Sequence, residues 1–319
     1  MRSLLLCVLC AVAAVPVLAQ KPIPVILDTD IGDDIDDAYA LSLAVQSPEL
    51  DIRAVVTVLQ QGQRRADLAW KILGLFGRTD IPVGVGAQTP LLGTPSDAVV
   101  RQTLALRPED QQPVSQRHNG ISLLIDTCLK APEKVTLLAY GPLTNLALAL
   151  RAEPRIREHV ERIVLMNGIF FKPEIEYNTV RDAEASAIVY ASGLPILTVG
   201  LDVTRQCRFS ADDMGRLSAS RYPTAQFLMQ ITRLWQNNRP EARPTLHDPL
   251  AVAVSFRPSF IRTQTGTVEV ELKGTPKKTY GMTLFRPDPK GTTQVASEVE
   301  SRAFLDFLLE RVLAPPRGR

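Results

Sequence analysis

The sequence contains few cysteines and no basic run, and each deficit excludes a class of protein. Of its four cysteines, Cys7 and Cys10 fall in the first twenty residues, which leaves Cys128 and Cys207. Two thiols cannot form the disulfide framework of a small secreted domain, so they either pair once or lie buried. Lys and Arg total 36 against 34 for Asp and Glu, and no basic run alternates with aromatics. This pattern argues against nucleic-acid binding and for a small-molecule partner.

Long hydrophobic runs are missing beyond residue 20. Within the first twenty residues, the basic Arg2 is followed by an apolar stretch at residues 4–15. Small residues at positions 17–19 then offer a cleavage point. The stretch is short for a membrane span. We therefore expect a signal peptide at residues 1–19, export to the periplasm or the extracellular space, and no membrane span in the mature form. The remaining residues 20–319 suit a single domain, and an uncleaved N-terminal anchor is the alternative.

Short apolar runs alternate with segments of helical periodicity. The runs are residues 25–27, 54–56, 83–85, 135–139, 163–165 and 196–199, and the helical segments are residues 38–45, 66–76, 121–129, 143–150 and 182–190. This alternation predicts an α/β fold, with an open, mostly parallel twisted sheet flanked by helices and a Rossmann-like core. Ligands of such sheets bind beyond the carboxyl ends of the strands, so the residues after each strand are the candidates for chemistry.

The C-terminal part follows a different pattern. Residues 268–272 and 280–285 predict an antiparallel pair of strands. Residues 297–313 predict a closing helix, with Ser297 and Glu300 at capping-box spacing. Residues 86–114 are rich in Pro, Gln and Thr and predict a long loop, either a lid or a surface excursion.

Six carboxylates lie within ten residues directly after the first predicted strand. The segment reads Asp28-Thr29-Asp30-Ile31-Gly32-Asp33-Asp34-Ile35-Asp36-Asp37. Like charges this close either raise one another's pKa or share a cation, and an all-oxygen cluster suits Ca²⁺ or Mg²⁺. A solvated surface is an alternative for Asp33 and Asp34. A plain helix start is the alternative for Asp36 and Asp37, because capping geometry and the helix dipole favour carboxylates there.

Three further segments place polar groups beside predicted helix starts. His247 and Asp248 open an apolar helix, where Asp248 is either a cap or part of an oxygen cage. The turn after residues 135–139 is either a plain strand-to-helix turn or the place where the Tyr140 carbonyl, released from the sheet, faces the same metal. Glu176 and Asn178 lie in a loop before a helix and suit sugar hydroxyls.

In this order, the four segments resemble the inosine-uridine preferring nucleoside hydrolase family, from Ile23 to at least Phe256. The resemblance implies an open α/β fold with one bound Ca²⁺, and cleavage of the N-glycosidic bond of ribonucleosides to ribose and free base. It also implies a homodimer or homotetramer. The roles it implies are metal ligation by Asp30, Asp37, Asp248 and the Tyr140 carbonyl, general base catalysis by Asp36, ribose contacts by Met166, Glu176 and Asn178, and protonation or steering of the departing base by His247.

The sequence departs from the family pattern at three places. The segment at residues 28–37, called the acidic loop below, has the form Asp-x-Asp-Pro-Gly-x-Asp-Asp in the family. This chain inserts two residues into that pattern and has Ile31 in place of the proline. Asp34 is therefore a rival to Asp36 as base or ligand. Residues 60–61 are Gln-Gln where the family usually has Gly-Asn, which puts one sugar contact in doubt. The segment at residues 167–175 is shorter than in the family, and we expect a different substrate preference.

The reaction that the resemblance implies passes through an oxocarbenium-like ribosyl transition state. Calcium orients the ribose diol and acidifies water, from which Asp36 accepts a proton. The helical aromatics Tyr222, Phe227 and Trp235 are expected to be core residues rather than parts of a base pocket, because aromatics at helical spacing are usually buried.

Two other functions compete with this one. Asp28 and Asp30 after a first strand also resemble the start of an aspartate-nucleophile phosphatase of the haloacid dehalogenase type, although Gly32 stands where that family has Thr or Val. In that case the pairs at residues 36–37 and 247–248 would have no role. The other rival is an exported calcium- or sugar-binding homologue that has lost turnover.

Overall fold

A single sheet of ten strands organises the described part of the chain. The computed structural model describes residues 21–94, 96–276 and 278–317, so the predicted signal peptide lies outside the described residues. The strands are β1 (Ile23–Thr29), β2 (Leu50–Thr57), β3 (Val83–Val85), β4 (Arg117–Asn119), β5 (Val135–Ala139), β6 (Val160–Met166), β7 (Ile196–Val199), β8 (Ile261–Val270), β9 (Thr283–Pro287) and β10 (Thr293–Val299). Their order across the sheet is β4-β3-β2-β1-β5-β6-β7-β10-β8-β9. Neighbours from β4 to β10 are parallel, and β8 is antiparallel to both β10 and β9, which confirms the predicted, mostly parallel sheet.

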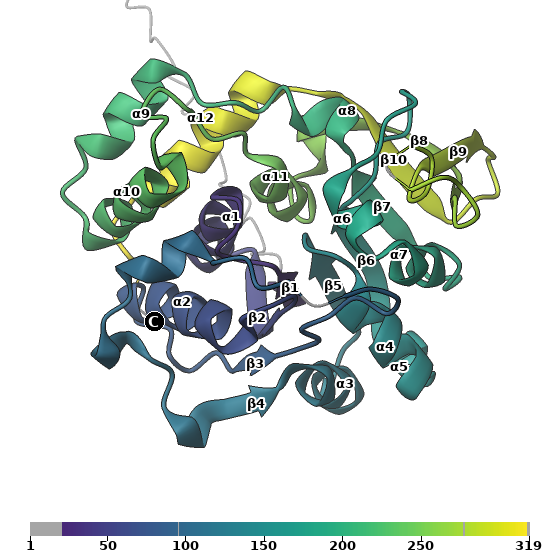
Figure 1. Ribbon diagram of the computed structural model, residues 1–319, viewed down its shortest axis with the longest axis horizontal. Helices are drawn as coiled ribbons and strands as arrows, with labels where there is room; N and C mark the ends of the chain where they lie inside the picture. The colour runs from purple at the N-terminus through teal and green to yellow at the C-terminus, as the bar shows by residue number, and fades with distance from the viewer. Residues whose placement is uncertain (1–20, 95, 277, 318–319) are drawn as a thin grey trace, which may run out of the picture.

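Helices cover both faces of the sheet (Figure 1). One face carries α1 (Asp36–Gln46), α2 (Gly62–Leu75), α8 (Leu201–Thr204), α9 (Ala211–Ser218), α10 (Pro223–Gln236), α11 (His247–Val254) and α12 (Ser301–Val312), and the other carries α3 (Gly120–Lys130), α4 (Thr144–Ala152), α5 (Ile156–His159) and α7 (Ala183–Tyr190). The short α6 (Tyr177–Arg181) precedes α7. Among the described residues, no helix is long and apolar enough to cross a membrane.

The central strands bury both of their faces. In β1, Val25 and Leu27 enter the core under α1 and α2, whereas Ile26 enters the core under α3 and α4. Successive side chains of a strand point to opposite faces, so a strand covered on both sides needs a continuous apolar run. That requirement explains why the short runs in the sequence predicted the strands correctly.

The direction in which the sheet grows reverses beside β1. The chain builds outward from β1 through β2 and β3 to β4, and then returns to place β5 on the other side of β1. Asp28 at the end of β1 therefore lies opposite Val56 of β2 and Ala139 of β5. Connections leaving β1 and β5 diverge to opposite faces, and this divergence opens a crevice at the carboxyl ends of the strands.

The C-terminal prediction was right about the antiparallel pair and wrong about the start of the last helix. Strands β8 and β9 pair antiparallel, as predicted. Ser297, however, belongs to β10, and α12 begins only at Ser301 without a side-chain cap. Pairing of β10 with both β7 and β8 outweighs the local capping signal, because it satisfies a whole strand of backbone groups. In the long loop, 3₁₀ turns form at Arg101–Ala105, Pro108–Asp110 and Val114–Gln116.

Cys128 and Cys207 are both buried free thiols. Cys128 belongs to α3 and lies in the core between that helix and the sheet, whereas Cys207 lies in the core on the opposite face of the sheet. Burial raises the pKa of each thiol to about 12. The reactive thiolate is therefore scarce at neutral pH.

We predict that neither thiol reacts with a disulfide reagent such as Ellman's reagent while the protein lacking residues 1–19 is folded. Both should react within minutes in denaturant, where burial is lost. A melting temperature unchanged by reducing agent is the accompanying control. Rapid reaction of a native thiol would contradict the buried placement.

Candidate active site

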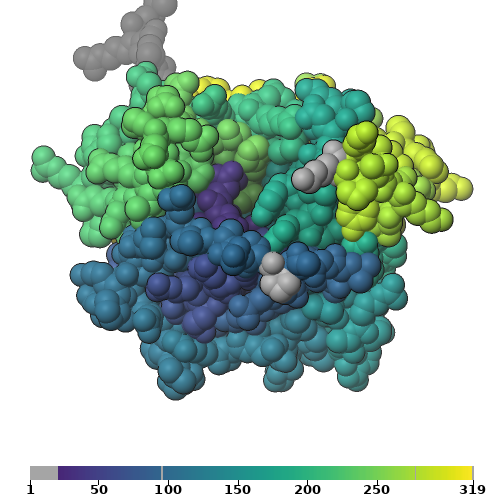
Figure 2. Space-filling model, in the orientation of Figure 1, coloured from purple at the N-terminus to yellow at the C-terminus, as the bar shows by residue number. Residues whose placement is uncertain are grey.

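A pocket of about 400 Å³ opens at the crevice beside β1 and β5. Figure 2 shows the surface hollowed near its centre, where the purple N-terminal part of the chain is visible beneath green and blue segments. The pocket is lined by Asp30, Asp33, Asp34, Asp36, Asp37, Tyr140, Met166, Glu176, Tyr177, Asn178, Leu201, Trp235, His247 and Asp248. The structure thus brings together all nine residues selected from the sequence, although they span more than 200 positions of the chain.

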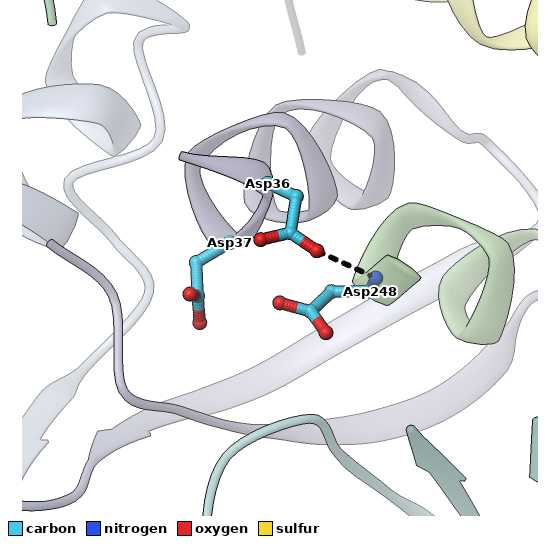
Figure 3. Close-up of side chains that lie close together, drawn as sticks. All are labelled: Asp36, Asp37 and Asp248. Atoms are coloured by element: carbon cyan, nitrogen blue, oxygen red, sulfur yellow. Dashed lines mark hydrogen bonds between the residues drawn. The ribbon is translucent and has the colours of Figure 1, made fainter. Parts of the chain in front are cut away.

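Three buried carboxylates form the centre of the pocket. Asp36 and Asp37 open α1, Asp248 lies in the first turn of α11, and these two helices pack against each other. Oxygen atoms of the three carboxylates lie within 4.8 Å of one another. Figure 3 shows their side chains converging, with the Asp248 backbone N–H donating to Asp36 Oδ2 at 3.0 Å.

The cluster is electrostatically unfavourable by itself. Burial raises the pKa of Asp36 to about 6 and that of Asp30 to about 7. The pKa values of Asp37 and Asp248 are raised well above the usual range, first by burial and then by the neighbouring carboxylates. Four buried acidic groups with only oxygen donors fit a hard divalent cation, which would replace the missing solvation. Asp30 lies outside the group of three but lines the same pocket.

A hydrogen-bond network fixes the wall formed by β5 and β6. The Asn178 amide donates from Nδ2 to the carbonyl of Tyr140 at 3.0 Å and to that of Met166 at 3.2 Å. Glu176 caps α6, because its carboxylate accepts from the backbone N–H groups of Asn178 and Thr179 at 2.7 and 2.8 Å. It also accepts from the backbone N–H of Gly168 at 3.1 Å. The strand ends and the sugar-binding candidates therefore hold one another in place.

His247 lies at the opposite wall, where α11 meets α8. Its Nδ1 is 2.7 Å from the Thr204 hydroxyl, which orients the ring. Burial lowers the pKa of His247 to about 4, so the imidazole is neutral at physiological pH. Asp34, the rival general base, is an exposed residue that lines the same pocket, and its Oδ1 accepts from the Ile35 backbone N–H. Desolvation and the neighbouring Asp36 charge raise its pKa to about 6, so the pKa does not separate the two residues. The exposure of Asp34 contrasts with the burial of Asp36 and favours Asp36 as the residue within the cluster.

Three pocket residues were missed in the sequence. Trp235, taken for a core residue, lies at the end of α10 and lines the pocket. The same expectation was wrong for Tyr222, which is 38% exposed, whereas Phe227 is buried as expected. Tyr177 is 53% exposed and lines the pocket, and its position between Glu176 and Asn178 was an available signal. Leu201 follows β7 and had no polar signature.

The geometry does not support the phosphatase alternative. The nucleophile of that reaction would be Asp28, whose side chain is 1% exposed and does not line the pocket. Its Oδ1 accepts from Asn145 Nδ2 at 3.3 Å, within the core. A carboxylate enclosed in this way cannot reach a phosphoryl group.

An open, mostly parallel α/β sheet with a pocket and buried carboxylates at its switch point is typical of an enzyme, and the carboxylates could hold a metal. The sequence matches the description "Inosine-uridine preferring nucleoside hydrolase" over residues 25–306. The chain belongs to this family of N-glycosyl hydrolases. That assignment confirms the resemblance inferred from the four ordered segments.

Individual proteins show the same similarity over nearly the whole chain. The pyrimidine-specific ribonucleoside hydrolase RihA of Citrobacter koseri is 32% identical over 309 residues, which cover 91% of this chain and 98% of that protein. The plant nucleoside hydrolase PpNRh1 superposes with a TM-score of 0.80 at 30% identity, covering 92% of this chain and 100% of that chain. A purine-preferring ribonucleoside hydrolase from Gardnerella vaginalis gives a TM-score of 0.79 at 25% identity, over 91% and 98% of the two chains.

We predict that Gly141→Ala damages the site. A Cβ at this position would lie 2.9 Å from both the backbone nitrogen and Oδ1 of Asp30, so the acidic loop must move. The expected cost is about 1–3 kcal/mol of stability and roughly 100-fold in turnover. Gly215→Ala is the matched control, because nothing lies within 4 Å of its Cβ. Urea unfolding and steady-state kinetics test both, and equal behaviour of the two variants would contradict the close approach.

A second prediction concerns the pH dependence of stability in the metal-free protein. Asp30 and Asp36 have folded-state pKa values of about 7 and about 6, raised from 3.8, so between about pH 4 and 7 the folded state binds more protons than the unfolded state. The stability that these protons supply is full below about pH 4, falls progressively above it, and is lost once the pH has risen through the folded-state values of about 6 and 7. Urea unfolding at pH 5 and pH 8 should show a loss that added divalent cation reduces. A metal-free protein more stable at pH 8 than at pH 5 would refute this.

Proposed function

We propose that this enzyme cleaves ribonucleosides, or a related N-riboside, to ribose and free base in a Ca²⁺-dependent reaction at the pocket beside β1 and β5. The observation that carries the proposal is the convergence of Asp36, Asp37 and Asp248, three carboxylates buried where the sheet reverses direction. An oxygen-only donor set favours calcium over the softer transition metals. Asp30, Asp37, Asp248 and the Tyr140 carbonyl are the proposed ligands.

The bound ion would supply two things, orientation of the ribose diol and a lower pKa for water. Asp36 is the proposed general base. Its Oδ2 accepts the Asp248 backbone N–H, which holds the carboxylate in place. A pKa of about 6 suits a base that works near neutral pH. The nearby carboxylates then face the positive charge that develops on the ribosyl ring.

The proposed ribose contacts come from the wall built on β6 and α6. Both amide hydrogens of Asn178 are engaged by the carbonyls of Tyr140 and Met166, so its Oδ1 is the atom left to accept from a sugar hydroxyl. Met166 lies beneath this position at the end of β6 and contributes an apolar surface for the ring. The Glu176 carboxylate accepts the backbone N–H groups at the start of α6, including that of Asn178. Its main effect on ribose binding is therefore to position Asn178.

His247 is proposed to act on the departing base. Because its ring is neutral near pH 7, it steers or hydrogen-bonds the base rather than acting as a preformed acid. Trp235, on the same wall, offers an aromatic face for stacking. Relatives include both a pyrimidine-specific and a purine-preferring hydrolase, so both classes of base are candidate leaving groups.

We further propose that the enzyme is exported, on the strength of the leader-like sequence at residues 1–19. N-terminal sequencing of the secreted or periplasmic protein would test this, with Gln20 as the expected first residue.

The proposed assembly is a homodimer or homotetramer, as the family resemblance implies, and analytical ultracentrifugation distinguishes the two.

The experiment that tests the function is release of reducing sugar from inosine, uridine, adenosine, cytidine and guanosine, before and after exhaustive chelation. We expect release from at least one nucleoside, its loss on chelation, and its recovery with Ca²⁺. Asp36→Asn should keep the metal and lose roughly 100-fold to 1000-fold in turnover, because it removes the base. Asp126→Asn, an exposed change on α3, is the matched control and should retain full activity.

The possible results separate the alternatives. No release from any nucleoside, by a protein shown to contain calcium, would overturn the proposed substrate class and favour a binding protein. Unimpaired turnover by Asp36→Asn would overturn the assignment of the base and return Asp34 to consideration.

A further inference from the structure

Arg65 of α2 is a buried cation that the proposed reaction does not use. Its side chain is 0% exposed and is among the largest fully buried side chains among the described residues. A guanidinium removed from water is costly unless its N–H donors are satisfied. The location of its acceptors therefore indicates what this burial achieves.

Three of the four acceptors belong to the acidic loop. Nη1 donates to the carbonyl oxygens of Asp30 and Ile31, the latter at 3.0 Å. Nη2 donates to Oδ2 of Asp33 at 2.8 Å, and Nε donates to the carbonyl of Gln60 at 2.8 Å. One planar group thus links the loop after β1 to the loop after β2.

The backbone on both sides of Gln60, whose carbonyl accepts from Arg65, is strained. Leu59 and Gln61 have φ values of 73° and 56°, in the left-handed region that side chains other than glycine seldom adopt. Between them, the carbonyl of Gln60 is directed to Nε of Arg65, and neither Gln60 nor Gln61 lines the pocket. Such strain persists only where surrounding contacts hold it.

We propose that Arg65 is a positioning residue that fixes the acidic loop so that the Asp30 side chain faces the cation. Its fork holds the backbone of Asp30 and Ile31 through their carbonyls, and its second amino group pairs with the Asp33 carboxylate. The inference rests on the cation site proposed above. Residues that support metal ligands in this way typically contribute roughly 10-fold to 100-fold to metal affinity.

Two effects of Arg65 on calcium binding have opposite signs. Its positive charge repels a cation at the neighbouring site, so charge alone predicts tighter binding when the arginine is replaced by a neutral residue. Its hydrogen bonds hold the loop, so positioning predicts weaker binding. Lysine keeps the charge but cannot reproduce the planar fork, and it therefore separates the two effects.

The test is calorimetric titration of Ca²⁺ into the metal-free full-length protein and its Arg65→Met and Arg65→Lys variants, with melting temperatures recorded with and without Ca²⁺. We expect both variants to raise the Kd for Ca²⁺ by roughly 10-fold or more and to lose part of the calcium-induced rise in melting temperature. Arg302→Met is the matched control. It removes a two-point contact with Asp213, at 3.0 Å for each bond, and should lower the melting temperature without changing the Kd.

Each remaining outcome is decisive. Tighter binding by Arg65→Met with unchanged binding by Arg65→Lys would show that only charge matters and would overturn the inference. An unchanged Kd with an equal loss of melting temperature in both states would reduce Arg65 to a structural residue. If Arg65→Met does not fold, Arg65→Lys decides the question alone. Failure of the wild-type protein to bind Ca²⁺ would overturn the cation site itself, a result distinct from equal binding by all variants.

Discussion

The burial of like charges at one end of β1 is the constraint on which the rest of the site depends. Asp30, Asp36, Asp37 and Asp248 are each no more than 5% exposed, and burial raises the pKa of every one. A protein can tolerate such a group only if positive charge or oriented donors compensate for the lost solvation. The architecture around the pocket supplies that compensation from several directions.

Two helix starts and one arginine contribute to it. Asp36 and Asp37 lie in the first turn of α1, and Asp248 lies in the first turn of α11, where the helix dipoles favour negative charge. The Thr29 hydroxyl donates to Asp37 at 2.5 Å. Arg65 adds a full positive charge beneath the loop. These contributions arrange the carboxylates without neutralising them all, and a divalent cation at the proposed site would complete the balance.

Much of this was predictable from the sequence, because the features concerned are local. Strands buried on both faces leave apolar runs, and the acidic loop, Tyr140, Glu176 and His247 each follow a strand or open a helix. Long-range pairing was not predictable. Ser297 carried a capping signal, yet it belongs to β10, at an irregularity in the pairing with β8, and the partners of that strand lie elsewhere in the chain.

The same distinction explains the missed residues of the site. Arg65 contacts a loop some 35 residues away, and nothing in its own neighbourhood distinguishes it from an exposed helical arginine. Trp235 has the helical spacing of a core aromatic, and only the packing of α10 beside the pocket exposes its ring to a ligand. Periodicity reports which face of a helix is apolar, but not what that face meets.

The central claim is that the buried carboxylates hold protons in the metal-free protein and exchange them for a divalent cation. Calorimetric titration of Ca²⁺ at pH 6.5, repeated in buffers of different ionisation enthalpy, counts the protons released per ion bound. The account predicts one site per chain and release of protons on binding, because ligands with raised pKa values must ionise. Binding without proton release, or no binding at all, would contradict it.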